Sequence, residues 1–215
     1  MNWEIIEDHS EQAKIKVIGV GGAGGNAVIH MMNHNIDGVE FICANTDAQA
    51  LAKANGATIL KLGGGITKGL GAGANPEVGR QAAERDRESL EELLDGADMV
   101  FITAGMGGGT GTGAAPAIAA ISKELGILTV GVVTQPFMFE GPMRKIRADK
   151  GIVELKKNCD TLLVIPNETL LEITESTTSV NDSFKLADSV LYLRFVLKTN
   201  NLYKWSFLKW RKKLS

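Results

Sequence analysis

Short apolar segments alternate along this chain with segments of helical periodicity, and this alternation restricts the possible folds more than any other feature. Strands are predicted at Lys16–Val20, Val39–Ala44, Thr58–Lys61, Met99–Thr103, Leu128–Thr134 and Leu162–Ile165. Helices are predicted at Asn26–Asn33, Ala48–Lys53, Pro76–Leu94, Ala114–Leu125 and Met143–Lys157, and a last helix begins near Ser179. The alternation is typical of an α/β fold that is doubly wound, with a mostly parallel sheet and helices on both faces.

Three glycine-rich segments each follow a predicted strand and lead into a predicted helix. They are Gly19–Asn26, Gly69–Asn75 and Gly105–Gly113. Glycine lets the backbone come close to a ligand because it has no Cβ, and the free N–H groups at a helix start bind anions. Together the segments predict a site that surrounds a polyphosphate with amide donors. The hydroxyls of Thr110 and Thr112 are available there to a phosphate or to a metal-bound water.

The first glycine segment also fits a second class of nucleotide site. Gly19, Gly21 and Gly24 satisfy the G-x-G-x-x-G dinucleotide fingerprint, and the acidic residue Asp47 follows at a suitable distance. A dinucleotide-binding oxidoreductase domain is therefore an alternative, although no His or Lys acid for hydride transfer is evident near the loops. An ordinary P-loop NTPase is disfavoured, because the sequence contains no G-x-x-x-x-G-K-[ST] segment.

Charge and cysteine content narrow the functional classes. The formal net charge of −2 combines an acidic body with a basic segment, residues 193–215, that contains seven Lys or Arg and no acid. An acidic body argues against non-specific nucleic-acid binding. Cys43 and Cys159 lie in apolar segments, which predicts buried, reduced thiols in a cytoplasmic protein. No segment approaches the length and apolar character needed to cross a bilayer.

The segment Gly107–Gly113 reads GGGTGTG and resembles the signature heptapeptide of the tubulin/FtsZ family. The resemblance continues in order and spacing through Asn45-Thr46-Asp47, Gly69–Pro76 and Pro136–Gly141, and covers residues 15–192. It implies a Rossmann-like GTPase domain that binds GTP or GDP, with Mg²⁺ as a further candidate ligand. The bacterial cell-division members imply a cytoplasmic protein that assembles at the division site with its own kind and meets other division proteins.

The same resemblance implies the residues that hold the nucleotide. Phosphate contacts are implied for Gly22, Ala23, Gly24 and Gly25, for Ala72, Gly73 and Ala74 at the terminal phosphate, and for Gly109, Thr110 and Gly111. Asn26 is implied near the base, Glu140 at the ribose and Arg144 beside it. Phe184 is implied to stack on guanine, and Asp188 to accept hydrogen bonds from its N1–H and 2-amino groups.

Two pairs of residues allow a plainer interpretation. Phe184 and Asp188 are four positions apart and share a helix face. From the residues alone a core ring and a solvated carboxylate are favoured, and the resemblance reverses that interpretation. His30 and His34 are also four apart and could bind a metal, but no third ligand is evident, so solvent or core roles are favoured.

Three parts of the chain are expected: a flexible segment at residues 1–14, the GTP-binding domain at 15–192 with the start of a central helix, and a divergent basic, aromatic tail at 193–215.

In the family the central helix leads to a loop whose acidic residues complete the GTP site of the next subunit, and nothing after Tyr192 resembles it. The expectation is a chain without a catalytic residue of its own, with capping or titration of full-length filaments as the alternative function. A shifted reading frame or a premature stop is the favoured origin of the tail, and a membrane-surface segment is the alternative.

Overall fold

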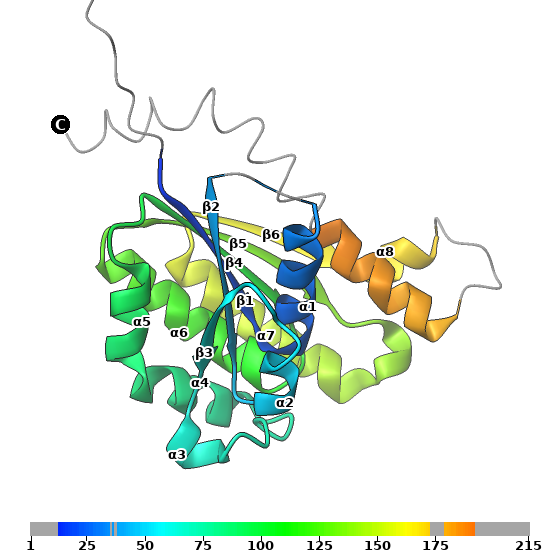
Figure 1. Ribbon diagram of the computed structural model, residues 1–215. Helices are drawn as coiled ribbons and strands as arrows, with labels where there is room; N and C mark the ends of the chain where they lie inside the picture. Colours follow the sequence, from blue (N-terminus) through cyan, green and yellow to red (C-terminus); the bar gives the residue numbers. More distant parts are fainter. Residues whose placement is uncertain (1–12, 35, 37, 173–178, 192–215) are drawn as a thin grey trace, which may run out of the picture.

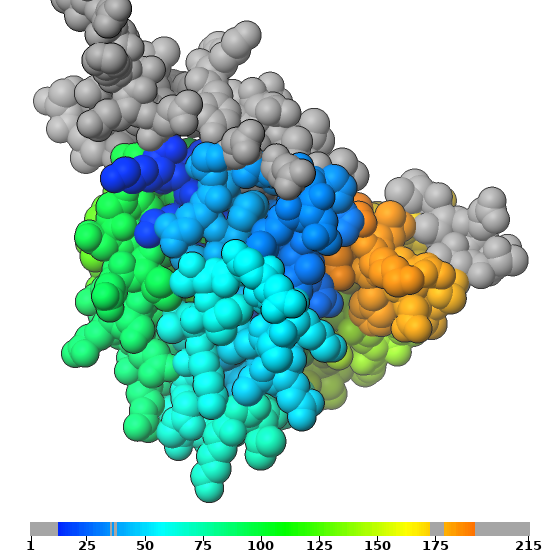
Figure 2. Space-filling view, viewed as in Figure 1, coloured from blue at the N-terminus to red at the C-terminus, as the bar shows by residue number. Residues whose placement is uncertain are grey.

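The computed structural model describes residues 13–34, 36, 38–172 and 179–191 (Figure 1 and, as a space-filling view, Figure 2). Six strands form one sheet in the order β3-β2-β1-β4-β5-β6, and every pairing between these strands is parallel. The strands are β1 (Ile15–Val20), β2 (Val39–Asn45), β3 (Thr58–Lys61), β4 (Met99–Gly105), β5 (Leu128–Gln135) and β6 (Thr161–Pro166). The predicted parallel sheet is therefore confirmed.

Helices cover both faces of the sheet (Figure 1). They are α1 (Gly21–Met32), α2 (Ala48–Leu51), α3 (Gly64–Thr67), α4 (Pro76–Arg85), α5 (Arg87–Leu94), α6 (Thr110–Glu124), α7 (Pro142–Asn158) and α8 (Glu168–Leu171), with a 3-10 turn η1 (Met138–Glu140). Residues 180–191 are also helical. The helices alternate with the strands along the chain, which gives the doubly wound α/β fold that the sequence predicts.

Two hydrophobic clusters, one on each face, hold the helices to the sheet. Successive residues of a strand point to opposite faces, so Val17 and Ile18, both fully buried, belong to different clusters. The Ile18 cluster contains residues of α4, α5, α6 and α7, whereas the Val17 cluster contains residues of α1, α2 and the 180–191 helix. Burial on both faces accounts for the continuous apolar character of these strands.

Three predicted helix boundaries are wrong. α1 begins at Gly21 instead of Asn26, and α6 begins at Thr110 instead of Ala114, because the glycine segments wind directly into the first helical turns. The single helix predicted over Pro76–Leu94 is divided at Asp86 into α4 and α5. The Asp86 carboxylate accepts a hydrogen bond from the Gly63 amide at 2.6 Å, a contact that fixes this break in place.

Other expectations concern the thiols and the chain ends. Cys43 is buried and Cys159 is half-buried, and both are free thiols. Burial raises the pKa of Cys43 to about 11 and that of Cys159 to about 12, so neither is a reactive thiolate at neutral pH.

No helix among the described residues is long and apolar enough to cross a membrane. The expected tail at 193–215 and residues 1–12 lie outside the described residues.

Gly113 allows α4 and α6 to pack in close contact. A Cβ at this position would lie 1.8 Å from the Pro76 carbonyl oxygen and 2.7 Å from the Arg80 backbone nitrogen. We expect Gly113→Ala to lower the free energy of unfolding by about 2–3 kcal/mol, because backbone atoms cannot move aside as a flexible side chain does. Urea denaturation measures the change.

The matched control for this prediction is Gly64→Ala. The nearest atom to a Cβ at Gly64 is the Lys61 Cε at 3.9 Å, so this site has room for a methyl group. Equal stability of the Gly113→Ala and Gly64→Ala proteins would contradict the close-packing explanation.

Candidate functional site

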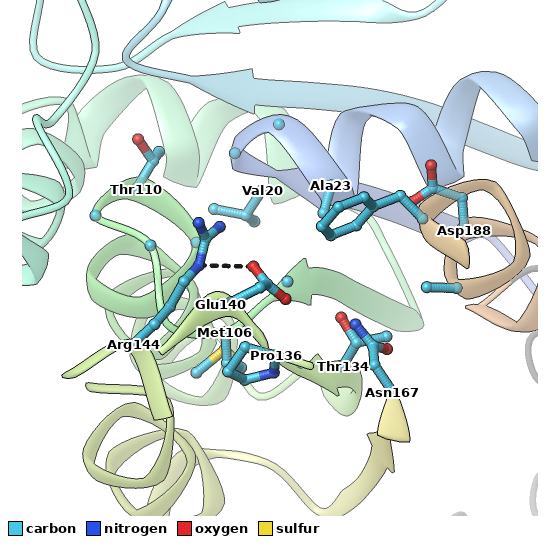
Figure 3. Close-up of a pocket in the computed structure, with 18 residues that line it drawn as sticks. Val20, Ala23, Met106, Thr110, Thr134, Pro136, Glu140, Arg144, Asn167 and Asp188 are labelled. Atoms are coloured by element: carbon cyan, nitrogen blue, oxygen red, sulfur yellow. Dashed lines mark ion pairs between the residues drawn. The ribbon is translucent and has the colours of Figure 1, made fainter. Parts of the chain in front are cut away.

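A pocket of about 210 Å³ opens where the carboxyl ends of the central strands meet the helix starts. Val20 of β1, Gly105 of β4 and Thr134 of β5 line it at these strand ends. The sheet order reverses between β1 and β4, and ligands of doubly wound folds bind at such a switch point. Figure 3 shows that side chains from several separate segments point into this region.

The first glycine segment forms one wall of the pocket. Val20 precedes α1 with an extended backbone, and no side chain caps the helix start. Gly21 has a φ of +74°, a conformation that favours glycine, and Gly21, Gly22 and Ala23 line the pocket. The N–H groups of a first helical turn have no acceptor within the helix, so the start of α1 offers free donors to an anion.

The signature segment forms the adjoining wall. Gly108, Gly109, Thr110 and Gly111 line the pocket, and α6 begins at Thr110, again without a side-chain cap. The Thr112 hydroxyl accepts a hydrogen bond from the Gly107 amide at 2.7 Å and fixes the turn. Two uncapped helix starts therefore meet at one end of the pocket, and their dipoles and amides favour a polyphosphate there.

Glu140 and Arg144 form an ion pair on the next side of the pocket (Figure 3). Glu140 Oε2 lies 3.0 Å from Arg144 Nε, and Glu140 Oε1 accepts a hydrogen bond from the Phe137 amide at 2.8 Å. The Glu140 side chain is 8% exposed, so both carboxylate oxygens are held in fixed directions. This carboxylate is suited to accept hydrogen bonds from neutral hydroxyl groups of a ligand.

The 180–191 helix supplies Phe184 and Asp188 to the pocket, and Asp188 lies at the opposite end from Thr110 (Figure 3). Phe184 is 39% exposed, which contradicts the core interpretation of this ring, and it packs edge-on against Phe137 and Phe139. Asp188 is partly buried, which contradicts the solvated interpretation of its carboxylate. Burial raises the pKa of Asp188 to about 7, and a hydrogen bond from the Asn26 side chain opposes part of this rise.

Nine of the residues implied by the resemblance line this pocket together. They are Gly22, Ala23, Gly109, Thr110, Gly111, Glu140, Arg144, Phe184 and Asp188. Gly25 and Asn26 line a neighbouring cavity of about 200 Å³, which shares Gly21 and Gly22 with the first. The pocket therefore collects most of the predicted set from segments far apart in the sequence.

Four other predicted residues do not line either cavity. A Cβ on Gly24 would lie 2.4 Å from the Thr103 carbonyl oxygen, so Gly24 serves the packing of α1 on β4. Ala72, Gly73 and Ala74 lie next to the signature segment instead: a Cβ on Gly109 would be 2.8 Å from that of Ala72. Gly73 and Ala74 are exposed, and Ala74 has a φ of +58°.

The pocket also contains residues outside the set implied by the resemblance. Five belong to the glycine-rich segments that predict a polyphosphate site: Val20, Gly21, Gly105, Met106 and Gly108. The individual residues that the sequence analysis did not single out are Thr134, Pro136, Asn167 and Ala187. Asn167 is 4% exposed, and its Oδ1 is a buried atom without a hydrogen-bond partner among the described residues. Thr134 lies near the end of β5, and Asn167 follows the last residue of β6. The rule that ligands bind beyond the carboxyl ends of parallel strands could have found both.

In the described part of the chain, no group of three His, Cys, Asp or Glu side chains is placed to hold a metal ion. The His30 and His34 rings lie 4.8 Å apart, and His34 Nδ1 is 2.8 Å from the His30 carbonyl oxygen. Burial, followed by the nearby His34, lowers the pKa of His30.

The chain is similar to known proteins over most of its described length. The Tubulin/FtsZ family, GTPase domain, matches residues 14–175. Cell division protein FtsZ of Pseudomonas aeruginosa is 62% identical over 189 residues, which cover 88% of this chain and 48% of that protein. The corresponding protein of Buchnera aphidicola subsp. Schizaphis graminum is 59% identical, over 85% of this chain and 47% of its own length.

Solved structures agree with these sequence matches. An empty FtsZ dimer from M. jannaschii superimposes with a TM-score of 0.83 and 46% identity, over 86% of this chain and 53% of that one. A GDP-bound CetZ1 monomer from Haloferax volcanii has a TM-score of 0.77 and 25% identity, over 85% and 58% of the two chains. The chain spans about half the length of the curated relatives it matches. On the strength of the domain match and these identities, the chain belongs to the tubulin/FtsZ family and contains its GTPase domain.

Proposed function

We propose that this chain binds GTP and GDP in the pocket at the carboxyl ends of β1, β4 and β5. The observation that carries the proposal is the pairing of two uncapped, glycine-rich helix starts at one end with the Phe184 ring and the Asp188 carboxylate at the other. An anion site and an aromatic site joined by one cavity fit a nucleotide. The family domain and the GDP named for the CetZ1 relative support the same ligand.

The phosphates would lie against the amides of α1 and α6. Gly22 and Gly108 have no heavy atom within 4 Å of the place a Cβ would occupy, so the backbone there is open to a ligand. Gly25, Gly73 and Ala74 complete the implied phosphate set from the neighbouring cavity and loop, with Ala72 packed behind Gly109. Phosphate is held in this scheme by backbone donors instead of a lysine.

The nucleoside would occupy the remaining length of the pocket. The ribose hydroxyls would donate to Glu140, whose orientation Arg144 maintains. The base would stack on Phe184 and present its N1–H and 2-amino group to Asp188, with Asn26 fixing the carboxylate. Adenine has no N1–H and no 2-amino group, so the Asp188 carboxylate would favour guanine. The unpartnered Asn167 Oδ1 is a further acceptor for a ligand hydroxyl or amino group.

Magnesium would accompany the triphosphate without a protein cage of its own. Magnesium sites in nucleotide-binding proteins are completed by phosphate oxygens and waters, with few protein ligands. The Thr110 hydroxyl, which lines the pocket, is a candidate to hold a coordinated water, whereas the expected role of Thr112 there is not supported, because its hydroxyl is buried and accepts from the Gly107 amide.

The deciding measurement is calorimetric titration of the purified chain with GTP, GDP, ATP and NAD. We expect the guanine nucleotides to bind on the order of 100-fold more tightly than ATP, because ATP leaves the Asp188 acceptors unpaired. Preferred binding of NAD would favour the dinucleotide-binding oxidoreductase alternative. Equal affinities for GTP and ATP would contradict the proposed role of Asp188.

Asp188→Asn tests the base contact directly. Ionised Asp188 is the form that accepts from guanine, and its pKa near 7 means that the free chain must lose a proton to bind below neutral pH. We expect the dissociation constant of GDP to rise about tenfold between pH 8 and pH 6. The variant should bind GDP about tenfold more weakly at pH 8 and lack the part of the pH dependence that Asp188 contributes.

Two controls accompany this variant. The phosphates of GDP titrate in the same pH range, and that contribution remains in Asp188→Asn, so the difference between the two proteins isolates the carboxylate. Asp182→Asn makes the same change on the same helix at an exposed residue outside the pocket, where Asp182 pairs with Lys185 at 3.0 Å. An identical pH slope in wild type and Asp188→Asn would exclude the assignment.

The ionisation of Asp188 has opposite effects on the two equilibria: it favours nucleotide binding but disfavours folding of the unliganded chain. Because the pKa is raised in the folded chain, the folded state binds more protons than the unfolded state between about pH 4 and pH 7. Ionisation of Asp188 therefore lowers the free energy of unfolding of the unliganded chain as pH rises through this range. Guanine nucleotide would restore part of that loss by supplying donors to the carboxylate.

We further propose that the chain assembles with its own kind and with full-length FtsZ subunits, at the division site and with hydrolysis completed between subunits. The names of the relatives, which include an FtsZ dimer, support this role. We expect GTP to cause the chain to sediment together with full-length FtsZ polymers. Ultracentrifugation with GTP and with GDP measures this. A chain that stays in the supernatant under both conditions would exclude assembly.

A further inference from the structure

We infer that Thr46 is a positioning residue for the phosphate end of the pocket, where its hydroxyl sets the Thr110 hydroxyl as a hydrogen-bond donor toward the ligand. The inference rests on the proposed nucleotide site and deepens it. Thr46 lies outside the pocket lining, and its side chain is fully buried. It therefore acts through Thr110, which does line the pocket.

The two threonine hydroxyls are in direct contact. Thr46 Oγ1 and Thr110 Oγ1 are 2.6 Å apart, although 64 residues separate them in sequence. Thr110 is 9% exposed and is the first residue of α6 (Figure 3). One of the two hydroxyls donates its proton to the oxygen of the other. The hydroxyl that accepts still has its own proton, which needs an acceptor elsewhere.

The surroundings decide the direction of this hydrogen bond. Among the described residues the Thr46 hydroxyl makes no hydrogen bond other than that with Thr110, and Thr46 is 0% exposed. If Thr110 donated, the Thr46 proton would remain buried and unpaired, which is costly. Donation by Thr46 satisfies both groups, because the Thr110 proton then points to the pocket. A phosphate oxygen there is the acceptor that this arrangement fits.

The backbone of Thr46 is fixed from the opposite side. Its carbonyl oxygen accepts hydrogen bonds from the Gly71 amide at 3.1 Å and from the Thr67 hydroxyl at 3.2 Å. The adjoining Asp47 forms an antiparallel bridge with Leu70. Thr46 therefore joins the 69–74 loop to the start of α6, so that both phosphate-facing segments share one rigid support.

A double-mutant cycle on GDP affinity tests the inference. Thr46→Val keeps a side chain of similar size but removes the donor, and we expect it to weaken GDP binding about tenfold. Thr110→Val should weaken binding by a similar factor, and the double variant should lose little more than either single one. Thr46→Ser keeps a hydroxyl and should restore affinity to within about twofold of wild type.

A matched control separates positioning from a general loss of stability. Thr129 is fully buried at the start of β5 and donates its hydroxyl to Ser122 Oγ at 2.8 Å, remote from the pocket lining. Thr129→Val should lower the melting temperature without changing the dissociation constant of GDP. If Thr46→Val does not fold, Thr46→Ala removes the same hydroxyl without the branched side chain, and is measured in its place.

The outcomes distinguish this inference from the proposed function. Wild-type affinity in Thr46→Val, or losses that add fully in the double variant, would overturn the positioning role while the nucleotide site stands. Failure of the unmodified chain to bind any guanine nucleotide would overturn the proposed function, and the inference with it. Tenfold losses that do not add would support both.

Discussion

The close contact between the starts of α1 and α6 is the constraint on which the rest of the structure depends. A Cβ on Gly21 would lie 3.0 Å from the Gly111 amide nitrogen, and one on Gly111 would lie 3.3 Å from the carbonyl oxygen of Val20, the residue before α1. Side chains at these positions would push the two helix starts apart. Because they meet, two sets of free amide donors face one volume at the edge of the sheet, and the remaining loops are arranged around that volume.

Much of this arrangement could be predicted from the sequence because its causes are local. The alternation of apolar and helical segments gave the parallel sheet, and the glycines after Val20 and Ala104 marked the anion-binding end. Local reasoning failed at the helix starts because glycine has a low helix propensity. Propensity therefore places each helix start after the glycines, although the helices begin within them. It failed at Asp86 as well, because the partner of that carboxylate, Gly63, is 23 residues away.

The long-range contacts that complete the site could not be predicted from residue spacing alone. The Thr46–Thr110 hydrogen bond links the residue after β2 to α6 across 64 residues, and the Asn26–Asp188 bond links α1 to the 180–191 helix. Neither partner reveals the other by sequence pattern. The resemblance found Asp188 and Asn26 because a family motif records such pairings, whereas Thr46 was visible only as one letter of Asn45-Thr46-Asp47.

The 180–191 helix has a narrow attachment to the rest of the chain. Ala187 and Leu191 are its buried apolar residues, and Ser189 Oγ lies 3.4 Å from His30 Nε2 across the junction with α1. A guanine ring between Phe184 and α1 would add a planar apolar surface to that junction and complete its packing. The nucleotide would then be a component of the hydrophobic core as much as a ligand. The occupancy of the site would then raise the stability of this helix by mass action, so that its melting would depend on the nucleotide concentration.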